Sequence, residues 1–197
     1  MKYVLGIDTS CYTSSLACVS LEGEVLLNKQ VLLELADGTR GLQQSKAIFN
    51  HLKNLPSITS ELKSTIDKPE LVAVCSSVKP RPQKDSYMPV FVLSQSLGQV
   101  IANINNVPYY ESTHQETHIM SGLYRLGGFK AKHFLVVHLS GGTTELLDVR
   151  VHNHGFDIDM IGSSLDLHAG QFVDRIGVSL GLPFPSGPHL EELANNE

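Results

Sequence analysis

The chain has 197 residues, 42% of them hydrophobic, which is enough to bury one substantial core or two modest ones. Its formal net charge of −5 provides no general positive field for nucleic acid, so an RNA contact needs a local basic patch or a partner. No apolar run approaches the length of a membrane span, and Asp8 comes too early for a secretory signal, so we expect a cytoplasmic protein without a membrane segment. The three cysteines lack C-x-x-C spacing and indicate neither a disulfide framework nor a cysteine zinc site.

Strands and helices alternate along the first part of the chain. Apolar runs predict strands at residues 4–7, 16–21, 25–31, 71–75 and 107–110. A first helix is predicted to end before Pro56, with an apolar face made of Leu42, Ile48, Phe49, Leu52 and Leu55. A second helix is predicted from Pro89 to Ile104. This order is typical of an α/β domain in which helices cover a mixed sheet.

A third helix follows these elements and leads into a second domain. It begins at Thr113, where Glu116 completes a capping box, and is expected to end at Gly127 and Gly128. The second domain starts near Lys132 and is predicted to contain three strands, a helix over residues 166–180 and a short segment after a Pro/Gly-rich stretch. As a copy of the first domain it would lack two strands and their helices. The exposed sheet edge then points to a truncated product or to completion by a partner.

Two segments of the chain share one pattern, an apolar strand, a turn of Gly and hydroxyl residues, and a second strand. They are residues 4–10 and residues 137–146. Glycine lets the backbone approach an anion, and exposed N–H groups and Ser/Thr hydroxyls bind its oxygens. Either turn by itself is more simply an ordinary β-turn. The repeat favours duplicated domains with a nucleotide-like ligand between the two turns.

His114 and His118 are spaced for metal binding. They are four residues apart on one predicted helix, so both imidazoles project from the same face about one turn apart. The positive end of the helix favours their neutral, metal-binding form. A zinc protease needs Glu directly after the first His, where this chain has Gln115, so protease activity is disfavoured. A pair of partly exposed polar residues is the equally weighted alternative.

Three acidic residues are further candidates. Asp8, at a strand end beside Ser10, is placed to position a metal-bound or attacking water, and the alternative is a turn cap. Asp174 is placed to accept hydrogen bonds from a ribose, and the alternative is a surface ion pair on its helix. Residues 185–188, followed by Glu191, are typical of a tight turn into a helix N-terminus, where backbone N–H groups meet an anion.

Four motifs in order resemble one protein family almost from end to end. They are Gly6-Ile7-Asp8-Thr9-Ser10-Cys11, His114-Gln115-Glu116-Thr117-His118, residues 139–146 (LSGGTTEL), and residues 169–175 (AGQFVDR) with residues 180–188 (LGLPFPSGP). The chain resembles the TsaD-like family, formerly classed as glycoproteases of family M22, which transfers threonylcarbamoyl to adenosine in tRNA. The resemblance implies an actin/hexokinase/Hsp70-like α/β fold of two domains, the second incomplete. It divides the chain into residues 1–111, a metal-motif helix and linker at 112–131, and residues 132–197.

The resemblance also implies roles for individual residues. It makes His114 and His118 ligands of one iron or zinc ion, whose third ligand, an aspartate, this chain does not contain. Asp8 and Ser10 are the candidate catalytic residues. The resemblance assigns an adenylate pocket, for ATP or an acyl-adenylate, to His138, Leu139, Ser140, Gly141, Gly142, Asp174, Gly187 and Glu191. The metal would orient threonylcarbamoyl-adenylate while the tRNA adenosine attacks its carbonyl.

This chain departs from the family pattern at three places. Tyr12 and Thr13 replace the usual Asp-Glu pair after the cysteine. Residues 77–82 (SVKPRP) replace a Gly-Pro-Gly-rich loop, and residues 166–168 (DLH) replace paired aspartates. The retained histidines favour a divergent transferase that binds metal and an acyl-adenylate.

The departures favour a non-catalytic, dimerising scaffold like the TsaB-like partner proteins. A metalloprotein without peptidase activity is a further alternative. A nucleotide-hydrolysing switch follows from superfamily analogy alone. The implied partners are a second copy or a TsaB-like protein, and tRNA if a basic surface exists.

Overall fold

The computed structural model describes residues 1–10, 12–34, 43–65, 69–127 and 130–195. The chain forms two compact units, Met1–Gly127 and Gly128–Glu197. Cys11, Leu42 and Gly128, which were named among the motifs and the predicted helix ends, lie outside the described residues. Among the described helices, none combines the length and apolar character that a membrane crossing requires.

The first unit contains a five-stranded mixed sheet in the order β3-β2-β1-β4-β5. Its strands are β1 (Lys2–Asp8), β2 (Thr13–Ser20), β3 (Val25–Leu32), β4 (Glu70–Lys79) and β5 (Tyr109–Thr113). The strands β1, β2 and β3 form an antiparallel meander, whereas β4 is parallel to both β1 and β5. The predicted mixed sheet is therefore confirmed.

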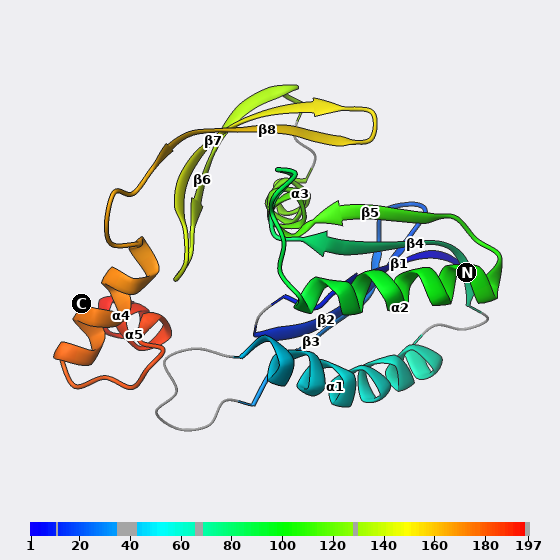
Figure 1. Ribbon diagram of the computed structural model, residues 1–197, viewed down its shortest axis with the longest axis horizontal. Helices are drawn as coiled ribbons and strands as arrows, with labels where there is room; N and C mark the ends of the chain where they lie inside the picture. Colours follow the sequence, from blue (N-terminus) through cyan, green and yellow to red (C-terminus); the bar gives the residue numbers. More distant parts are fainter. Residues whose placement is uncertain (11, 35–42, 66–68, 128–129, 196–197) are drawn as a thin grey trace. The chain divides into compact units, whose positions relative to one another are not determined.

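Three helices flank this sheet: α1 (Gln44–Thr65), α2 (Val90–Asn105) and α3 (His114–Arg125). Figure 1 shows α1 and α2 on one side of the sheet and α3 on the other. Alternate side chains of β1 and β2 are buried, and these pack with Ile58 of α1 and Ala102 of α2 in the main core. Gly98 lets α2 approach β4 closely, since a Cβ there would lie 2.2 Å from Ser76 Oγ. On the other face of the sheet, α3 packs against β4 and β5.

The first helix differs from its prediction in length and in its buried face. It continues through Pro56 to Thr65 instead of ending before the proline. Proline lacks the N–H of the helix ladder, but Ile58 in the next turn is only 1% exposed and holds the helix on the sheet. The fully or nearly buried residues are Ala47, His51, Leu55 and Ile58, whereas Phe49 and Leu52 are exposed. The pattern of apolar residues did not indicate this face, because one of its buried positions is a histidine and not an aliphatic residue.

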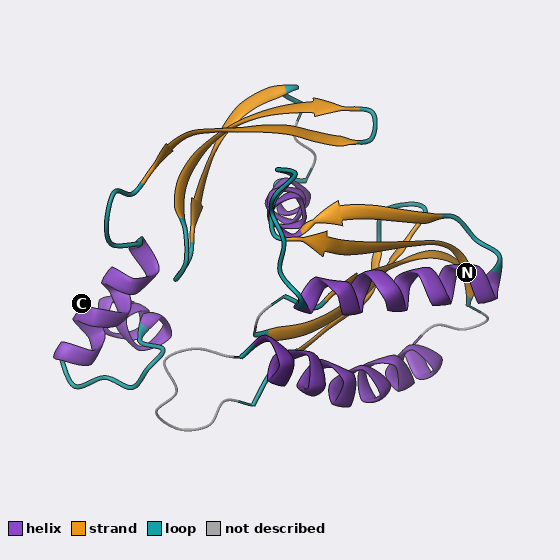
Figure 2. Ribbon diagram, in the orientation of Figure 1, coloured by secondary structure: helices purple, strands orange, loops and turns teal. Residues whose placement is uncertain are grey.

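The second unit contains a three-stranded antiparallel sheet and two helices (Figure 2). Its elements are β6 (His133–Leu139), β7 (Thr144–His152), β8 (Gly155–Ser163), α4 (Ala169–Ser179) and α5 (Gly187–Asn195). The meander β6-β7-β8 repeats the layout of β1-β2-β3. In the first unit the free side of β1 is occupied by β4, but no described strand pairs with the equivalent side of β6. The expectation of an incomplete second sheet is confirmed.

Candidate metal centre and glycine turn

The start of α3 fixes the two motif histidines on the first turns of a helix. The Thr113 side chain accepts a hydrogen bond from Glu116 N at 3.2 Å, and Glu116 Oε2 accepts one from Thr113 N at 2.7 Å. This is the predicted capping box, which satisfies the first N–H groups of the helix. Gln115 N also donates to the carbonyl of Pro80. The helix start is thereby tied to the loop that follows β4.

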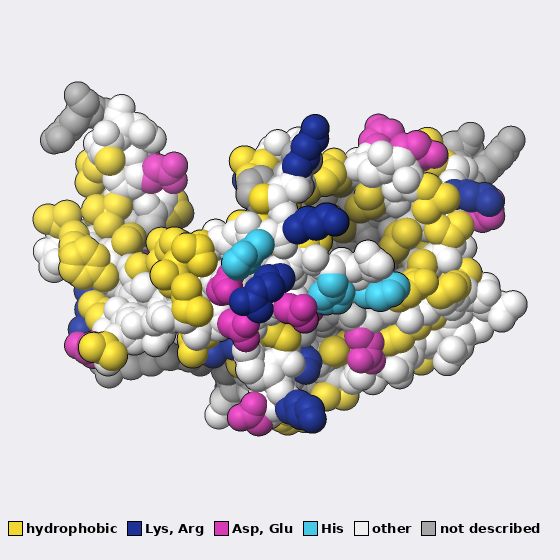
Figure 3. All heavy atoms as spheres, turned by 90° about the horizontal axis from the view of Figure 1, so that it is seen from above, with side chains coloured by type: hydrophobic (Ala, Val, Ile, Leu, Met, Phe, Trp, Pro, Cys, Tyr) yellow, Lys and Arg dark blue, Asp and Glu magenta, His cyan; other side chains and the backbone are white. Residues whose placement is uncertain are grey.

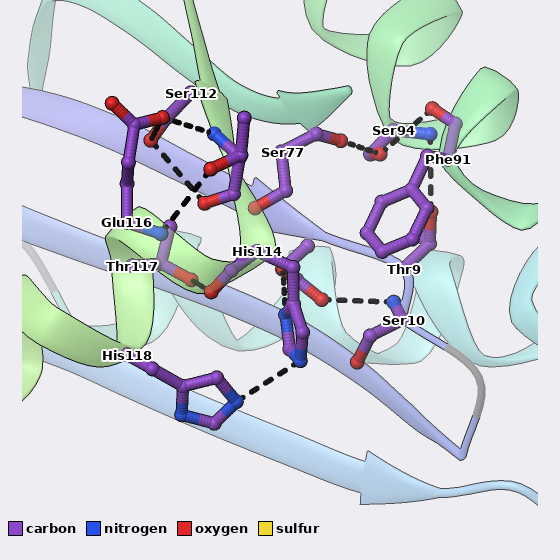
Figure 4. A network of polar contacts seen from close by, with 12 residues as sticks. Thr9, Ser10, Ser77, Phe91, Ser94, Ser112, His114, Glu116, Thr117 and His118 are labelled. Carbon is purple, nitrogen blue, oxygen red and sulfur yellow. Dashed lines mark hydrogen bonds and ion pairs between the residues drawn. The ribbon is translucent and has the colours of Figure 1, made fainter. Parts of the chain in front are cut away.

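The two histidine rings converge on one point. His114 Nε2 and His118 Nε2 are 3.0 Å apart, and the rings stand edge to face with centroids 4.4 Å apart (Figure 4). Two imidazole nitrogens that each lie about 2.0–2.1 Å from one zinc ion are about 3 Å from one another. The pair therefore has the separation of two ligands of one ion. Within the described residues, no group of three or more His, Cys, Asp or Glu side chains is placed to hold a metal ion.

Asp8 joins this pair from the end of β1. Its Oδ2 lies 2.9 Å from His114 Nδ1, and its Oδ1 accepts a hydrogen bond from Ser10 N at 2.8 Å. Burial opposes ionisation, but the hydrogen bond and the charge of His114 lower the pKa of Asp8 to about 2. Asp8, Ser10, His114 and His118 thus gather at one end of the sheet.

A pH prediction follows from Asp8 in the metal-free protein. Its pKa is about 2 in the folded chain against an ordinary value of 3.8, so the carboxylate stabilises the fold above pH 3.8. That stabilisation, roughly 2 kcal/mol, is lost as the pH falls through about 2. We expect the difference in free energy of unfolding between wild type and Asp8→Asn to shrink by roughly this amount between pH 5 and pH 2. Urea unfolding with a chelator measures it, and a constant difference would contradict the assignment.

Buried hydroxyls hold the end of β1 against α2. Thr9 Oγ1 donates to the carbonyl of Val90 at 2.8 Å and accepts from Ser94 N at 3.2 Å. Ser94 Oγ in turn donates to the carbonyl of Ser77 on β4. Since Thr9 and Ser94 are fully buried, these bonds fix the backbone that carries Asp8.

Sequence reasoning missed one polar pair near this end of the sheet. Ser14 Oγ lies 2.8 Å from His51 Nδ1, and both residues are fully buried. Burial lowers the pKa of His51, which favours a neutral ring. The only signal was a histidine inside the predicted helix, four residues before Leu55 and therefore on the same helix face.

The glycine turn of the second unit packs against the start of α4. Ser140 Oγ lies 2.6 Å from Thr143 Oγ1 and accepts a hydrogen bond from Gly142 N at 3.1 Å. Gly170 N donates to the carbonyl of Ser140 at 3.1 Å. Gly141 and Gly142 are exposed and would have open space around an added Cβ. The predicted turn is therefore open, and a helix N-terminus is bonded to it.

The other predicted nucleotide ligands also lie in the second unit. His138 Nδ1 is 3.7 Å from Glu145 Oε2, and the Leu139 side chain is exposed. Asp174 Oδ1 accepts a hydrogen bond from Ser186 N at 2.8 Å, which ties α4 to the residue before α5. Gly187 begins α5, and Glu191 is exposed on it. The assignment of these residues to a pocket stays a prediction.

Basic and acidic side chains do not form separate patches on the visible surface. On the face shown in Figure 3, Lys and Arg side chains are interspersed with Asp and Glu. On the second sheet, Arg150 lies 2.8 Å from Asp148 and 3.4 Å from Asp159. In the first unit, Lys29 lies 2.9 Å from Glu61. An RNA partner would therefore not meet a concentrated positive field on that face.

Comparison with known proteins identifies relatives over the full chain. No family model matches. A tRNA N6-adenosine threonylcarbamoyltransferase of Prochlorococcus marinus (strain NATL1A) is 30% identical over 202 aligned positions, which cover 100% of this chain and 54% of that protein. The chain is thus similar over its whole length to part of a tRNA N6-adenosine threonylcarbamoyltransferase. The enzyme of the same name from Thermotoga neapolitana is 27% identical over 97% of this chain and 56% of its own length. The chain thus spans about half the length of these curated relatives.

Solved structures share the fold of this chain. An uncharacterised protein with similarity to peptidase YeaZ from Pseudomonas aeruginosa superposes with a TM-score of 0.51 at 12% identity, over 81% of this chain and 64% of that one. The ethanolamine utilisation protein EutJ from Carboxydothermus hydrogenoformans gives a TM-score of 0.51 at 14% identity, over 96% and 61%. The predicted actin/hexokinase/Hsp70-like α/β fold is confirmed.

Proposed function

We propose that this chain is a cytoplasmic, metal-binding TsaD-like protein for threonylcarbamoyl transfer to tRNA adenosine. His114 and His118 hold one iron or zinc ion. The turn at residues 138–142 holds the nucleotide of ATP or an acyl-adenylate, together with Asp174, Gly187 and Glu191. The observation that carries the proposal is the 3.0 Å separation of the two Nε2 atoms. The similarity of nearly the whole chain to part of two threonylcarbamoyltransferases supports the reaction class.

The residues present fit a metal ion in part. Two neutral imidazoles suit iron or zinc, and a carboxylate on the far nitrogen of one ring is a common support of such a ligand. When bound, the ion supplies Lewis-acid polarisation of a carbonyl. The chain itself holds the two imidazole rings in position, through the capping box at the start of α3 and through the contact of Asp8 with His114. Among the described residues, no third protein ligand is placed beside the two rings.

The nucleotide half of the proposal is supported by the open turn. Exposed glycines allow close approach of phosphate oxygens to the backbone, and the Ser140 and Thr143 hydroxyls supply further hydrogen-bonding groups. The start of α4 adds the positive end of a helix beside this turn. Asp174 contributes by holding the segment before α5 in place.

Metal content tests the proposal directly. Elemental analysis of untagged protein should find about one iron or zinc per chain, lost in His114→Ala/His118→Ala. A matched control is His152→Ala/His154→Ala, which removes two exposed histidines of the second unit and should keep the metal. Loss in both variants would indicate adventitious binding to surface histidines.

Absence of metal from wild type, even after incubation with iron or zinc and an adenine nucleotide, would overturn the catalytic proposal. It would favour a non-catalytic scaffold that works as a homodimer or beside a TsaB-like partner. Tyr12 supports that alternative, because an exposed aromatic side chain stands where the family has an acid.

A further inference from the structure

The two oxygens of Asp8 have different partners. Oδ1 faces the backbone N–H of Ser10, which can only donate, at 2.8 Å. Oδ2 faces His114 Nδ1 at 2.9 Å. An ionised carboxylate only accepts hydrogen bonds, so the ring must present a proton on Nδ1. A neutral His114 with its proton on Nδ1 has a lone pair on Nε2, the atom directed at His118.

We propose that Asp8 is a positioning residue that fixes His114 as the Nδ1–H tautomer and thereby keeps Nε2 free to bind a ligand atom. Its consequence for metal binding rests on the proposed function, whereas the tautomer itself does not. Carboxylates that accept from the second nitrogen of a metal-binding histidine set ring orientation and basicity in this way. The same strand end is also held by the hydrogen bond from Ser10 N to Asp8 Oδ1 and by the bond from the buried Thr9 hydroxyl to the carbonyl of Val90.

The contact between the two histidines agrees with this assignment. With no proton on His114 Nε2, the 3.0 Å contact is a hydrogen bond in which His118 Nε2–H donates. When a metal binds at this point, the exposed His118 ring must no longer carry its proton on Nε2. The half-buried His114 ring already has its Nε2 unprotonated. The Phe91 ring, with its centroid 5.9 Å from that of His114, limits the movement of the His114 ring. The pair therefore consists of one fixed and one adjustable ligand.

The substitution Asp8→Asn should reverse the tautomer with little change of shape. The Ser10 N–H still requires an acceptor, so the carbonyl oxygen of the new amide stays on that side. Its NH₂ group then faces His114 and donates to Nδ1, which places the ring proton on Nε2. The same exchange of carboxylate for amide leaves geometry intact and produces the wrong histidine tautomer in the Ser-His-Asp triad.

Nitrogen NMR of histidine-labelled, metal-free protein tests the tautomer. At about pH 8.5, above the ordinary histidine pKa, His114 should show a protonated Nδ1 and an unprotonated Nε2. Asp8→Asn should exchange these two signals, and His114→Ala assigns them. Asp148→Asn is the matched control, because it alters the Asp–His pair formed with His133 and should leave His114 unchanged. A protonated Nε2 of His114 in wild type would overturn the proposal, whether or not Asp8→Asn folds.

Zinc titration then separates the tautomer from metal binding. Asp8→Asn should weaken zinc binding by about 10–100-fold relative to wild type, while Asp148→Asn should not. Unchanged zinc affinity in Asp8→Asn, despite exchanged nitrogen signals, would overturn the positioning role. If wild type shows the expected tautomer but binds no zinc, the proposed function fails and the role of Asp8 in fixing the ring stands.

Discussion

Phe91→Ala should lower the free energy of unfolding of the first unit by about 3–5 kcal/mol. Phe91 is 2% exposed at the start of α2 and packs with Leu33, Ala47 and Val90 in a second buried cluster. Its removal leaves a cavity between α1 and α2 that the surrounding side chains fill only in part. The substitution should also loosen His114, whose ring is tilted 50° to the Phe91 ring.

Hydrogen exchange of peptides from the first unit, followed by mass spectrometry, measures this effect without assuming that both units unfold together. Val92→Ala is the matched control on the same helix, because Val92 is 43% exposed and should change stability by less than about 0.5 kcal/mol. Equal protection in Phe91→Ala and Val92→Ala would show that the cluster does not stabilise this unit.

Gly170→Ala should destabilise the second unit by about 1–3 kcal/mol and disrupt the glycine turn. An added Cβ would lie 2.6 Å from Gly141 N and 2.7 Å from the carbonyl carbon and oxygen of Ser140. These are backbone atoms, so α4 or the turn must move, and the hydrogen bond from Gly170 N to Ser140 is strained or broken. If the turn holds a nucleotide, affinity for an adenine nucleotide should fall at least about tenfold, which equals 1.4 kcal/mol.

Gly142→Ala is the control that separates folding from binding. Nothing lies within 4 Å of its added Cβ, so we expect a change in stability below about 0.5 kcal/mol. Calorimetric titration with an adenine nucleotide should nevertheless show weaker binding, because the methyl group blocks close approach to the turn. Unaltered nucleotide affinity in both glycine variants would remove the turn from the binding site.

The local features of the chain were predictable because they depend on short segments. The capping box of Thr113 and Glu116 requires only residues within one helical turn, and the structure confirms it. The spacing of His114 and His118 follows from helix geometry in the same way. The first helix was mispredicted because Pro56 and the buried His51 are tolerated through packing against the sheet, which no local pattern reveals.

The amino-acid sequence by itself determined the α/β class, the repeated meander and the presence of two histidines on one helix face. Only the tertiary structure decided what those groups contact. Asp8 and His114 are 106 residues apart, and they meet because β1 and β4 are parallel neighbours and α3 starts beyond β5 on the side of the sheet that α1 and α2 leave open. Asp174 likewise takes Ser186 N as its partner because α4 and α5 pack closely at Gly177. Such contacts depend on how strands pair and helices pack, and residue spacing does not encode either directly.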